Sequence, residues 1–140
     1  MISKTLYPTP REQRTSADGG DPTHVVVGAD SISTAVAEQL RTSAYDAAVV
    51  EVSDEGERLD SASTTDALSG TPLPAAETVV VATRSDARNM LLGQAIRTKY
   101  PVSRVVVLVN DPDCAESFDD AGFETVCATT TLTEELVEAV

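Results

Sequence analysis

HVVVGADSIS, residues 24–33, begins with a short β-branched run, HVVVGA (24–29), which contains Gly28 and is followed by a polar turn. A continuous apolar run of this length predicts a strand that is buried on both of its faces. The next residues, SISTAVAEQLRTS (31–43), predict a helix, because apolar residues recur there at helical spacing: Ile32, Ala35, Val36 and Leu40. Parallel α/β sheets use a strand, a glycine turn and a helix in this order to hold a phosphate group.

The rest of the chain repeats this alternation. Further strands are predicted at 46–52, 78–83, 102–110 and 124–129, and further helices at 86–100, 113–121 and 131–140. Buried strands that alternate with helices indicate a parallel sheet covered on both faces. The predicted fold class is therefore α/β, with a Rossmann-like, doubly wound, mainly parallel sheet and helices on both faces.

Three details of the helices can also be predicted. The apolar stripe of the helix at 86–100 is expected to consist of Met90, Leu91, Ala95 and Ile96. Gly122 is expected to end the short helix before it, and Thr133 can cap the last helix.

One domain is expected over residues 24–140, because 140 residues are enough for a single core. Residues 1–23 are polar and rich in proline and glycine, so they predict a flexible N-terminal arm. Residues 54–76 are acidic, rich in Ser and Thr, and close with Pro72 and Pro74, so they predict no clear element.

The charge of the chain limits its partners. Asp and Glu number 23 against 10 Lys and Arg, which gives a formal net charge of −13. Such a surface repels nucleic acid and an anionic membrane, so we expect neither as a direct partner. An acidic surface poor in lysine resembles those of salt-loving microbes. Two cysteines, one histidine, no long apolar run and no apolar leader predict a cytoplasmic protein without a structural zinc site or a membrane span.

Ligands of a doubly wound sheet bind outside the carboxyl ends of its strands. Suggestive residues follow four of the predicted strands: Gly28-Ala29-Asp30, Glu51, Thr83 to Asp86 with Asn89 one turn later, and Asn110-Asp111. Glu51 follows Gly28 by 23 residues. Dinucleotide-binding folds place a ribose-binding carboxylate about 20 residues after the glycine turn. Glu51 is therefore a candidate ribose ligand, and the alternative is a strand-end carboxylate that faces water.

The glycine turn departs from the dinucleotide fingerprint G-x-G-x-x-G. The three glycine positions are occupied here by Gly28, Asp30 and Ser33. Ser33 is small enough for close packing of helix and strand, whereas Asp30 adds a side chain and a negative charge where a pyrophosphate would approach. Asp30 is also well placed to cap the helix that begins at residue 31. If Asp30 opposes phosphate, Asp30→Gly is expected to tighten dinucleotide binding.

The combined pattern resembles the N-terminal nucleotide-binding domain of Trk-type potassium-uptake regulators, the RCK or KTN domain. The resemblance covers about residues 24–130 and is most specific in AT-x-x-D-x-x-N at 82–89, in the strand that leads to Asn110-Asp111, and in AGFETV. It implies a Rossmann-like fold that binds NAD(H) or ATP/ADP. It also implies assembly into dimers or ring tetramers and docking on the cytoplasmic face of a potassium channel or transporter.

The resemblance also assigns residues to the site. Gly28, Ala29, Asp30 and Ser31 occupy the phosphate turn, Glu51 the ribose position, and Thr83, Asp86 and Asn89 the loop and helix beside the nucleotide. Three departures oppose phosphate: Asp30 itself, Ser31 where the family often has arginine, and Leu108 where it often has another. Each charge-assisted bond to phosphate is worth about 1.5–3 kcal/mol, so losing two weakens binding by orders of magnitude unless Arg84 or Arg88 compensates.

Two further departures concern the extent of the domain. The segment between the second and third predicted strands is shorter than in the family, so one of the usual strands is expected to be truncated. Residues 24–140 contain no counterpart of the C-terminal ligand-sensing domain of full-length regulators.

Three functions remain open from the sequence. The first is a stand-alone regulatory subunit of a potassium-transport system that binds adenine nucleotide, with affinity reduced by the degenerate turn. The second is an interaction module that keeps the fold and the oligomer interface without the ligand. The third, a small oxidoreductase, is the weakest, and we expect the chain not to be an enzyme. His24 begins the first strand, roughly 13 Å from Ser31 and Ser33, and Cys127 is expected to lie in the core.

Overall fold

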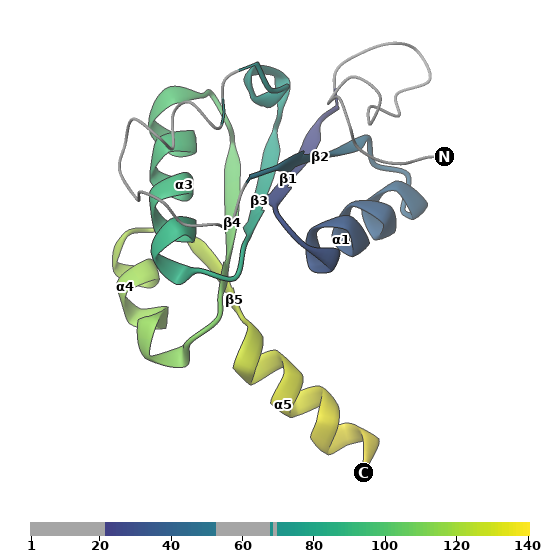
Figure 1. Cartoon of the computed structure of the whole chain (residues 1–140), viewed down its shortest axis with the longest axis vertical. Helices are drawn as coiled ribbons and strands as arrows, with labels where there is room; N and C mark the ends of the chain where they lie inside the picture. Colours follow the sequence, from purple (N-terminus) through teal and green to yellow (C-terminus); the bar gives the residue numbers. More distant parts are fainter. Residues whose placement is uncertain (1–21, 53–67, 69) are drawn as a thin grey trace.

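The computed structural model describes residues 22–52, 68 and 70–140, which form one layered α/β unit (Figure 1). The strands are β1 (His24–Gly28), β2 (Ala47–Glu51), β3 (Thr78–Ala82), β4 (Arg104–Val109) and β5 (Glu124–Cys127). The helices are α1 (Ser31–Thr42), α3 (Asp86–Lys99), α4 (Ala115–Asp120) and α5 (Ala128–Ala139), with short 3-10 turns at Leu73–Ala75 and Pro112–Cys114.

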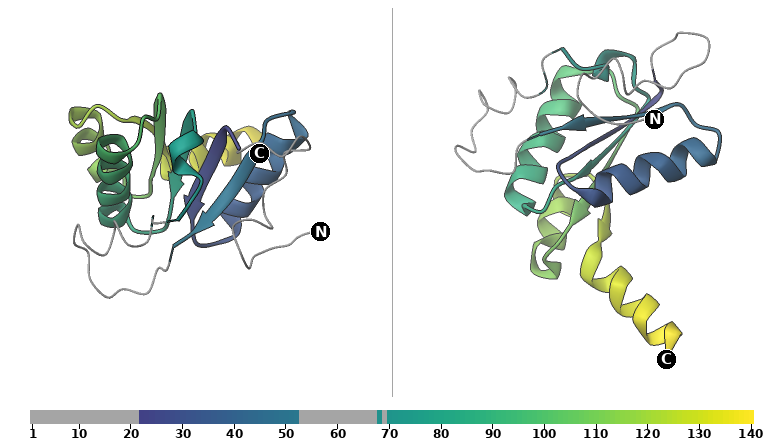
Figure 2. Two further views of the ribbon diagram at one scale, coloured as in Figure 1. Left: turned by 90° about the horizontal axis from the view of Figure 1, so that it is seen from above. Right: turned by 45° about the vertical axis from the view of Figure 1, so that its right-hand side comes forward.

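The five strands form one parallel sheet in the order β2-β1-β3-β4-β5. From β1 the chain moves outward to β2, then returns across β1 to β3 and continues in the opposite direction. The strand order therefore reverses between β1 and β3. α1 covers one face of the sheet, while α3 and α4 lie on the other (Figures 1 and 2). The predicted Rossmann-like, doubly wound fold is confirmed.

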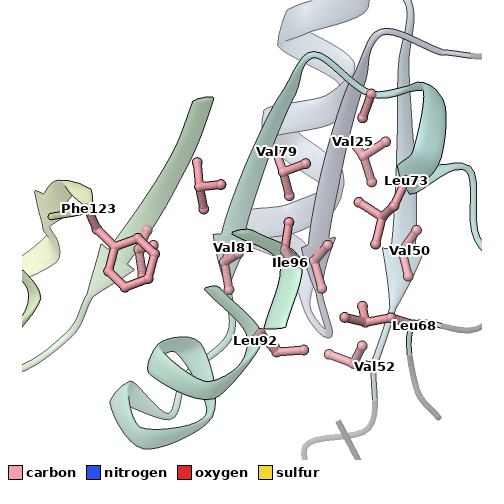
Figure 3. Close-up of a cluster of buried hydrophobic side chains, with 14 of the residues drawn as sticks. Val25, Val50, Val52, Leu68, Leu73, Val79, Val81, Leu92, Ile96 and Phe123 are labelled. Atoms are coloured by element: carbon pink, nitrogen blue, oxygen red, sulfur yellow. The ribbon is translucent and has the colours of Figure 1, made fainter. Parts of the chain in front are cut away.

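The main core lies between the sheet and α3 (Figure 3). Alternate valines of the strands meet Leu92 and Ile96 of α3, all of them buried. The predicted stripe of α3 is mostly confirmed, because Ile96 is buried and Met90 and Ala95 pack against this core while partly buried; Leu91 is only partly buried. Gly93 also faces this interface, since a Cβ there would lie 3.0 Å from the ring of Phe123.

A smaller cluster fills the other face, where Val26 of β1 and Ala47 of β2 meet Ala37 of α1. Val36 and Leu40 pack against it as predicted, whereas Ile32 is 49% exposed and Ala35 is exposed. The prediction of Ile32 and Ala35 as core residues was wrong, because the helix turns Ser33 and Ala37 toward the sheet instead.

The same face of the sheet is less covered beyond α1. Val106 and Leu108 of β4 are partly buried there, and Val126 of β5 is 46% exposed. Register places Val106 beside Val80, and Val126 beside Leu108, on the face that α1 covers at Val26. Parallel sheets are normally covered on both faces, but among residues 22–52, 68 and 70–140 no further element covers this region.

α5 leaves the body of the protein and buries no residue (Figures 1 and 2). It begins at Ala128 directly after β5, so Thr133 lies inside the helix and the predicted cap there was wrong. Cys127 is the residue before the helix and is partly exposed rather than a core residue. Gly122 does follow α4 with a positive φ of 88°, as expected for a residue that ends a helix.

Two sequence predictions fall wholly or mainly outside the described residues. The proposed N-terminal arm is described only for residues 22 and 23, and most of the segment 54–76, with its expected shortened strand, is not described. Within residues 22–52, 68 and 70–140, no helix is both long and apolar enough to cross a membrane.

Candidate functional site

The carboxyl ends of β1, β2 and β3 meet at one edge of the sheet, on both sides of the point where the strand order reverses. Parallel register places Gly28 directly beside Glu51 on one side and beside Ala82 on the other. Doubly wound sheets bind ligands in the crevice above such a reversal. This edge is therefore the candidate site.

Gly28 is required here by packing. A Cβ at this position would overlap Ser33 Oγ and lie 2.8 Å from the carbonyl oxygen of Ala82. Ser33 is buried, and its hydroxyl lies 3.5 Å from the same carbonyl oxygen. The glycine thus lets the first turn of α1 approach β1 and β3 closely, as the fingerprint requires of its helix and strand.

Asp30 caps α1, which confirms the capping interpretation. Its Oδ1 accepts a hydrogen bond from the backbone N–H of Ile32 at 3.2 Å. Its Oδ2 accepts a second one from Nε of Arg84 at 2.8 Å, which forms an ion pair between the loops after β1 and β3. The carboxylate predicted to oppose phosphate is therefore neutralised by an arginine that follows β3.

The same edge also carries the remaining residues predicted for the turn and the ribose, namely Ala29, Ser31 and Glu51. Ala29 is partly buried, and Ser31 is exposed at the start of α1. Glu51 is the exposed last residue of β2. The structure thus brings Gly28, Asp30 and Glu51 together on adjacent strand ends.

Asn89 lies below the site surface and has no exposed area. Its Oδ1 accepts hydrogen bonds from the backbone N–H of Thr83 at 3.0 Å and from Thr83 Oγ1 at 2.6 Å. Its Nδ2 donates to the carbonyl oxygens of Thr83 at 3.1 Å and Leu108 at 2.9 Å. These four bonds use the whole hydrogen-bonding capacity of the amide, so Asn89 positions the loop after β3.

Asp86 braces the neighbouring loop after β4. Its Oδ1 accepts from the backbone N–H of Asn110 at 2.7 Å and from Asn110 Nδ2 at 3.0 Å, while its Oδ2 accepts from the backbone N–H of Asp111 at 2.9 Å. Asn110 Nδ2 also donates to the carbonyl oxygen of Thr83 at 3.1 Å. The motif at 82–89 therefore ties three segments together: the loops after β3 and β4 and the first turn of α3.

Two further contributors were assigned no role from the sequence. Ser85 caps α3 by accepting from the backbone N–H of Arg88 at 3.1 Å. Thr129 Oγ1 donates to the carbonyl oxygen of Asn110 at 3.1 Å and so ties the start of α5 to this edge. A serine directly before the first residue of a helix is a recognisable capping position. The Thr129 contact, in contrast, depends on tertiary structure alone.

The two thiols beside this edge differ in acidity. Partial burial, together with the carboxylates of Asp86 and Asp111, raises the pKa of the Cys114 thiol. A hydrogen bond from the backbone N–H of Thr130 lowers the pKa of the Cys127 thiol. Among the described residues no group of three or more His, Cys, Asp or Glu side chains is arranged to hold a metal ion.

Comparison with known proteins agrees with the fold described above. The sequence model of the TrkA-N domain matches residues 24–129. The NAD(P)-binding domain of an exopolyphosphatase-related protein from Archaeoglobus fulgidus superposes with a TM-score of 0.65 at 16% identity, over 84% of this chain and 96% of that one. The GsuK channel bound to NAD superposes with a TM-score of 0.55 at 20% identity.

The overlap with GsuK covers 79% of this chain but only 22% of the GsuK chain. At these identities the two structures establish the fold alone. No curated protein sequence matches the chain.

Proposed function

Because the chain belongs to the TrkA-N domain family, we propose that it is a regulatory subunit of a potassium-transport system that binds NAD(H). The observation that carries this proposal is the direct register of Gly28 with Glu51 beside the reversal point of the sheet. A close-packed glycine and a neighbouring carboxylate are what a dinucleotide-binding edge needs for its phosphates and its ribose.

The comparisons favour NAD(H) over ATP/ADP, because one structural neighbour is an NAD(P)-binding domain and the other is a channel bound to NAD. In this assignment the backbone at Gly28 receives the pyrophosphate, and Glu51 accepts hydrogen bonds from the adenosine ribose. A carboxylate at the ribose also disfavours the 2′-phosphate of NADP. Thr83, Asp86 and Asn89 fix the shape of the loops beside the ligand.

We assign no catalytic role to the chain. His24, its single histidine, is the first residue of β1 and so lies at the amino edge of the sheet, opposite the site. At about 3.3 Å per residue, β1 separates His24 from the site by more than the reach of a hydrogen bond. The bound nucleotide is then a regulatory ligand rather than a co-substrate.

The proposed partners are the cytoplasmic side of a potassium channel or transporter and a second copy of this chain. α5 supports the second copy, because Leu132 and Leu136 are 60% and 67% exposed on a helix that buries nothing. Their spacing puts them on one face of the helix. The thinly covered sheet face at Val106, Leu108 and Val126 is an apolar surface that α5 of another copy can cover.

A second candidate function, an interaction module without a ligand, is favoured by one observation. The carboxylate of Asp30 already accepts hydrogen bonds from a backbone N–H in the first turn of α1 and from the side chain of Arg84. Such a module would keep the fold and the interface on α5 while its site stays filled by its own side chain.

Thermal unfolding in molar KCl with NAD, NADH, ATP, ADP or AMP at millimolar concentration decides between the two functions. A ligand at 100 times its dissociation constant stabilises the fold by about 2.7 kcal/mol, a shift of several degrees for a domain of this size. We expect a shift with NAD or NADH. A shift with ATP or ADP alone would replace the proposed ligand, and no shift with any nucleotide would support the interaction module.

A further inference from the structure

The Asp30–Arg84 ion pair spans the one place in this sheet where a ligand is expected. Asp30 follows β1 and Arg84 follows β3, and these are the two strands between which the strand order reverses. The two residues are 54 positions apart in sequence, and their charged atoms are 2.8 Å apart. The pair therefore bridges the loops that follow β1 and β3.

The carboxylate of Asp30 makes the contacts that a phosphate would make. One oxygen takes a backbone N–H at the start of α1, and the other takes the guanidinium of Arg84. Arginine binds phosphate oxygens with the same charged N–H groups that it offers to a carboxylate. An internal anion thus occupies both donors.

We propose that Asp30 is an internal competitor of the ligand's phosphate, and that Arg84 transfers from Asp30 to the phosphate when the nucleotide binds. This inference rests on the proposed function, since it names the cation and the competitor of that same site. Asp30 then sets how much ligand is needed to open the site.

The exposure of the pair makes such an exchange feasible. The Arg84 side chain is 76% exposed and that of Asp30 is 18% exposed. Exposed ion pairs change an equilibrium constant by no more than about fivefold. A phosphate that carries more charge and offers more acceptor oxygens can displace Asp30, and the helix then keeps a nearby anion at its N-terminus.

A double-mutant cycle on Asp30 and Arg84 tests the exchange, with Kd for NAD measured by calorimetry in molar KCl. Asp30→Asn removes the charge but keeps a good capping residue, so the fold is retained. Asp30→Asn is expected to bind NAD up to about fivefold more tightly than the wild type, because the competing charge is gone. Adding Arg84→Gln to Asp30→Asn is expected to weaken binding about tenfold, because Arg84 then holds the phosphate itself.

A static pair gives the opposite result in the double variant. If Arg84 only neutralises Asp30 and never contacts the ligand, Asp30→Asn/Arg84→Gln binds NAD as tightly as Asp30→Asn, and this result overturns the proposal. Failure of Asp30→Asn to tighten binding also overturns it. If none of the four proteins binds NAD, the proposed function falls together with the exchange.

Charge-matched controls lie at the opposite edge of the sheet. Lys99→Gln removes one exposed positive charge at the last turn of α3, about 20 Å along the helix from its start. Asp120→Asn removes one exposed negative charge at the end of α4. Both are expected to leave Kd for NAD within about twofold of the wild type, because molar salt screens charges at such distances. A change equal to that of the Asp30 or Arg84 variant would overturn the local exchange.

Discussion

Asn89 and Thr83 are joined by three direct hydrogen bonds, through the backbone N–H, the carbonyl oxygen and the hydroxyl of the threonine. A fourth bond links Asn89 to the carbonyl oxygen of Leu108 in β4. One buried side chain therefore holds the end of β3, the first turns of α3 and the end of β4 in a fixed relation. The shape of the candidate site depends on it.

Asn89→Ala is expected to lower the free energy of unfolding by about 3 kcal/mol, because the buried N–H of Thr83 and the carbonyl oxygen of Leu108 lose the hydrogen bonds that Asn89 makes. Urea denaturation followed by circular dichroism measures this. Gln94→Ala, on the exposed side of the same helix, is the control and should change stability by less than about 0.5 kcal/mol. Equal effects of the two substitutions would contradict the role of Asn89.

Gly28→Ala is expected to lower the free energy of unfolding by about 2 kcal/mol, because the new Cβ overlaps Ser33 Oγ and crowds the Ala82 carbonyl oxygen. Ser33→Gly removes one of these obstacles but itself costs about 1 kcal/mol in a helix. The double variant should therefore be more stable than the sum of the single effects predicts. Strict additivity in urea denaturation would show that the two residues are not in contact.

Glu51→Gln is expected to raise Kd for NAD about tenfold, because it removes the charged acceptor proposed for the ribose. It should also narrow the preference for NAD over NADP. Since Glu51 is exposed, the free energy of unfolding should stay within about 0.5 kcal/mol of the wild type. The control is Glu77→Gln, an exposed residue just before β3 at the opposite edge. If both variants bind NAD as the wild type does, Glu51 is only a strand-end carboxylate.

Leu132→Asp with Leu136→Asp is expected to convert a dimer into a monomer, as measured by sedimentation velocity in molar KCl. The melting temperature of this monomeric double variant should remain close to that of the wild-type chain measured as a monomer, because α5 buries no residue within one chain. Glu134→Gln with Glu138→Gln changes the opposite side of the helix and should leave the dimer intact. A wild-type chain that sediments as a monomer at high concentration would remove the second copy from the proposal.

Cys127 is expected to react with iodoacetamide faster than Cys114 at neutral pH. The pKa of Cys127 is lowered and that of Cys114 is raised, so the thiolate of Cys127 is populated at lower pH. Rates measured against pH on Cys114→Ser and Cys127→Ser, each with a single thiol, should show the lower midpoint for the variant that retains Cys127. Equal midpoints would contradict the hydrogen bond from Thr130.

The sheet could be predicted from the sequence because its signals are local. Each strand is a short run of β-branched residues, and the runs predicted at 24–29 and 78–83 begin at the first residues of β1 and β3. Given the observed reversal of strand order, the right-handed connections of parallel sheets place α1 and α3 on opposite faces. Gly28, Glu51 and the cap at Asp30 could be placed for the same reason, since each follows directly from the end of a strand.

The rest depends on contacts between distant segments. The pairing of Asp30 with Arg84 joins two loops that no local pattern connects, so the sequence showed two isolated charges. Asn89 is a polar residue at a buried position, where hydropathy predicts an apolar one, so hydropathy alone did not place it among the buried residues of α3. The start of α5 was predicted at residue 131 instead of Ala128, because a threonine-rich segment offers several capping residues. The helix in fact follows β5 without a turn.

The isolation of α5 makes its order depend on concentration. A helix of 12 residues is at or below the length that is stable alone in water, and its run of threonines has low helix propensity. In a lone chain residues 128–139 should therefore exchange between helix and coil, and their amides should lose protection from hydrogen exchange within the first seconds. Assembly would then fold this segment, so the protection of its amides would report the fraction of chains that are assembled.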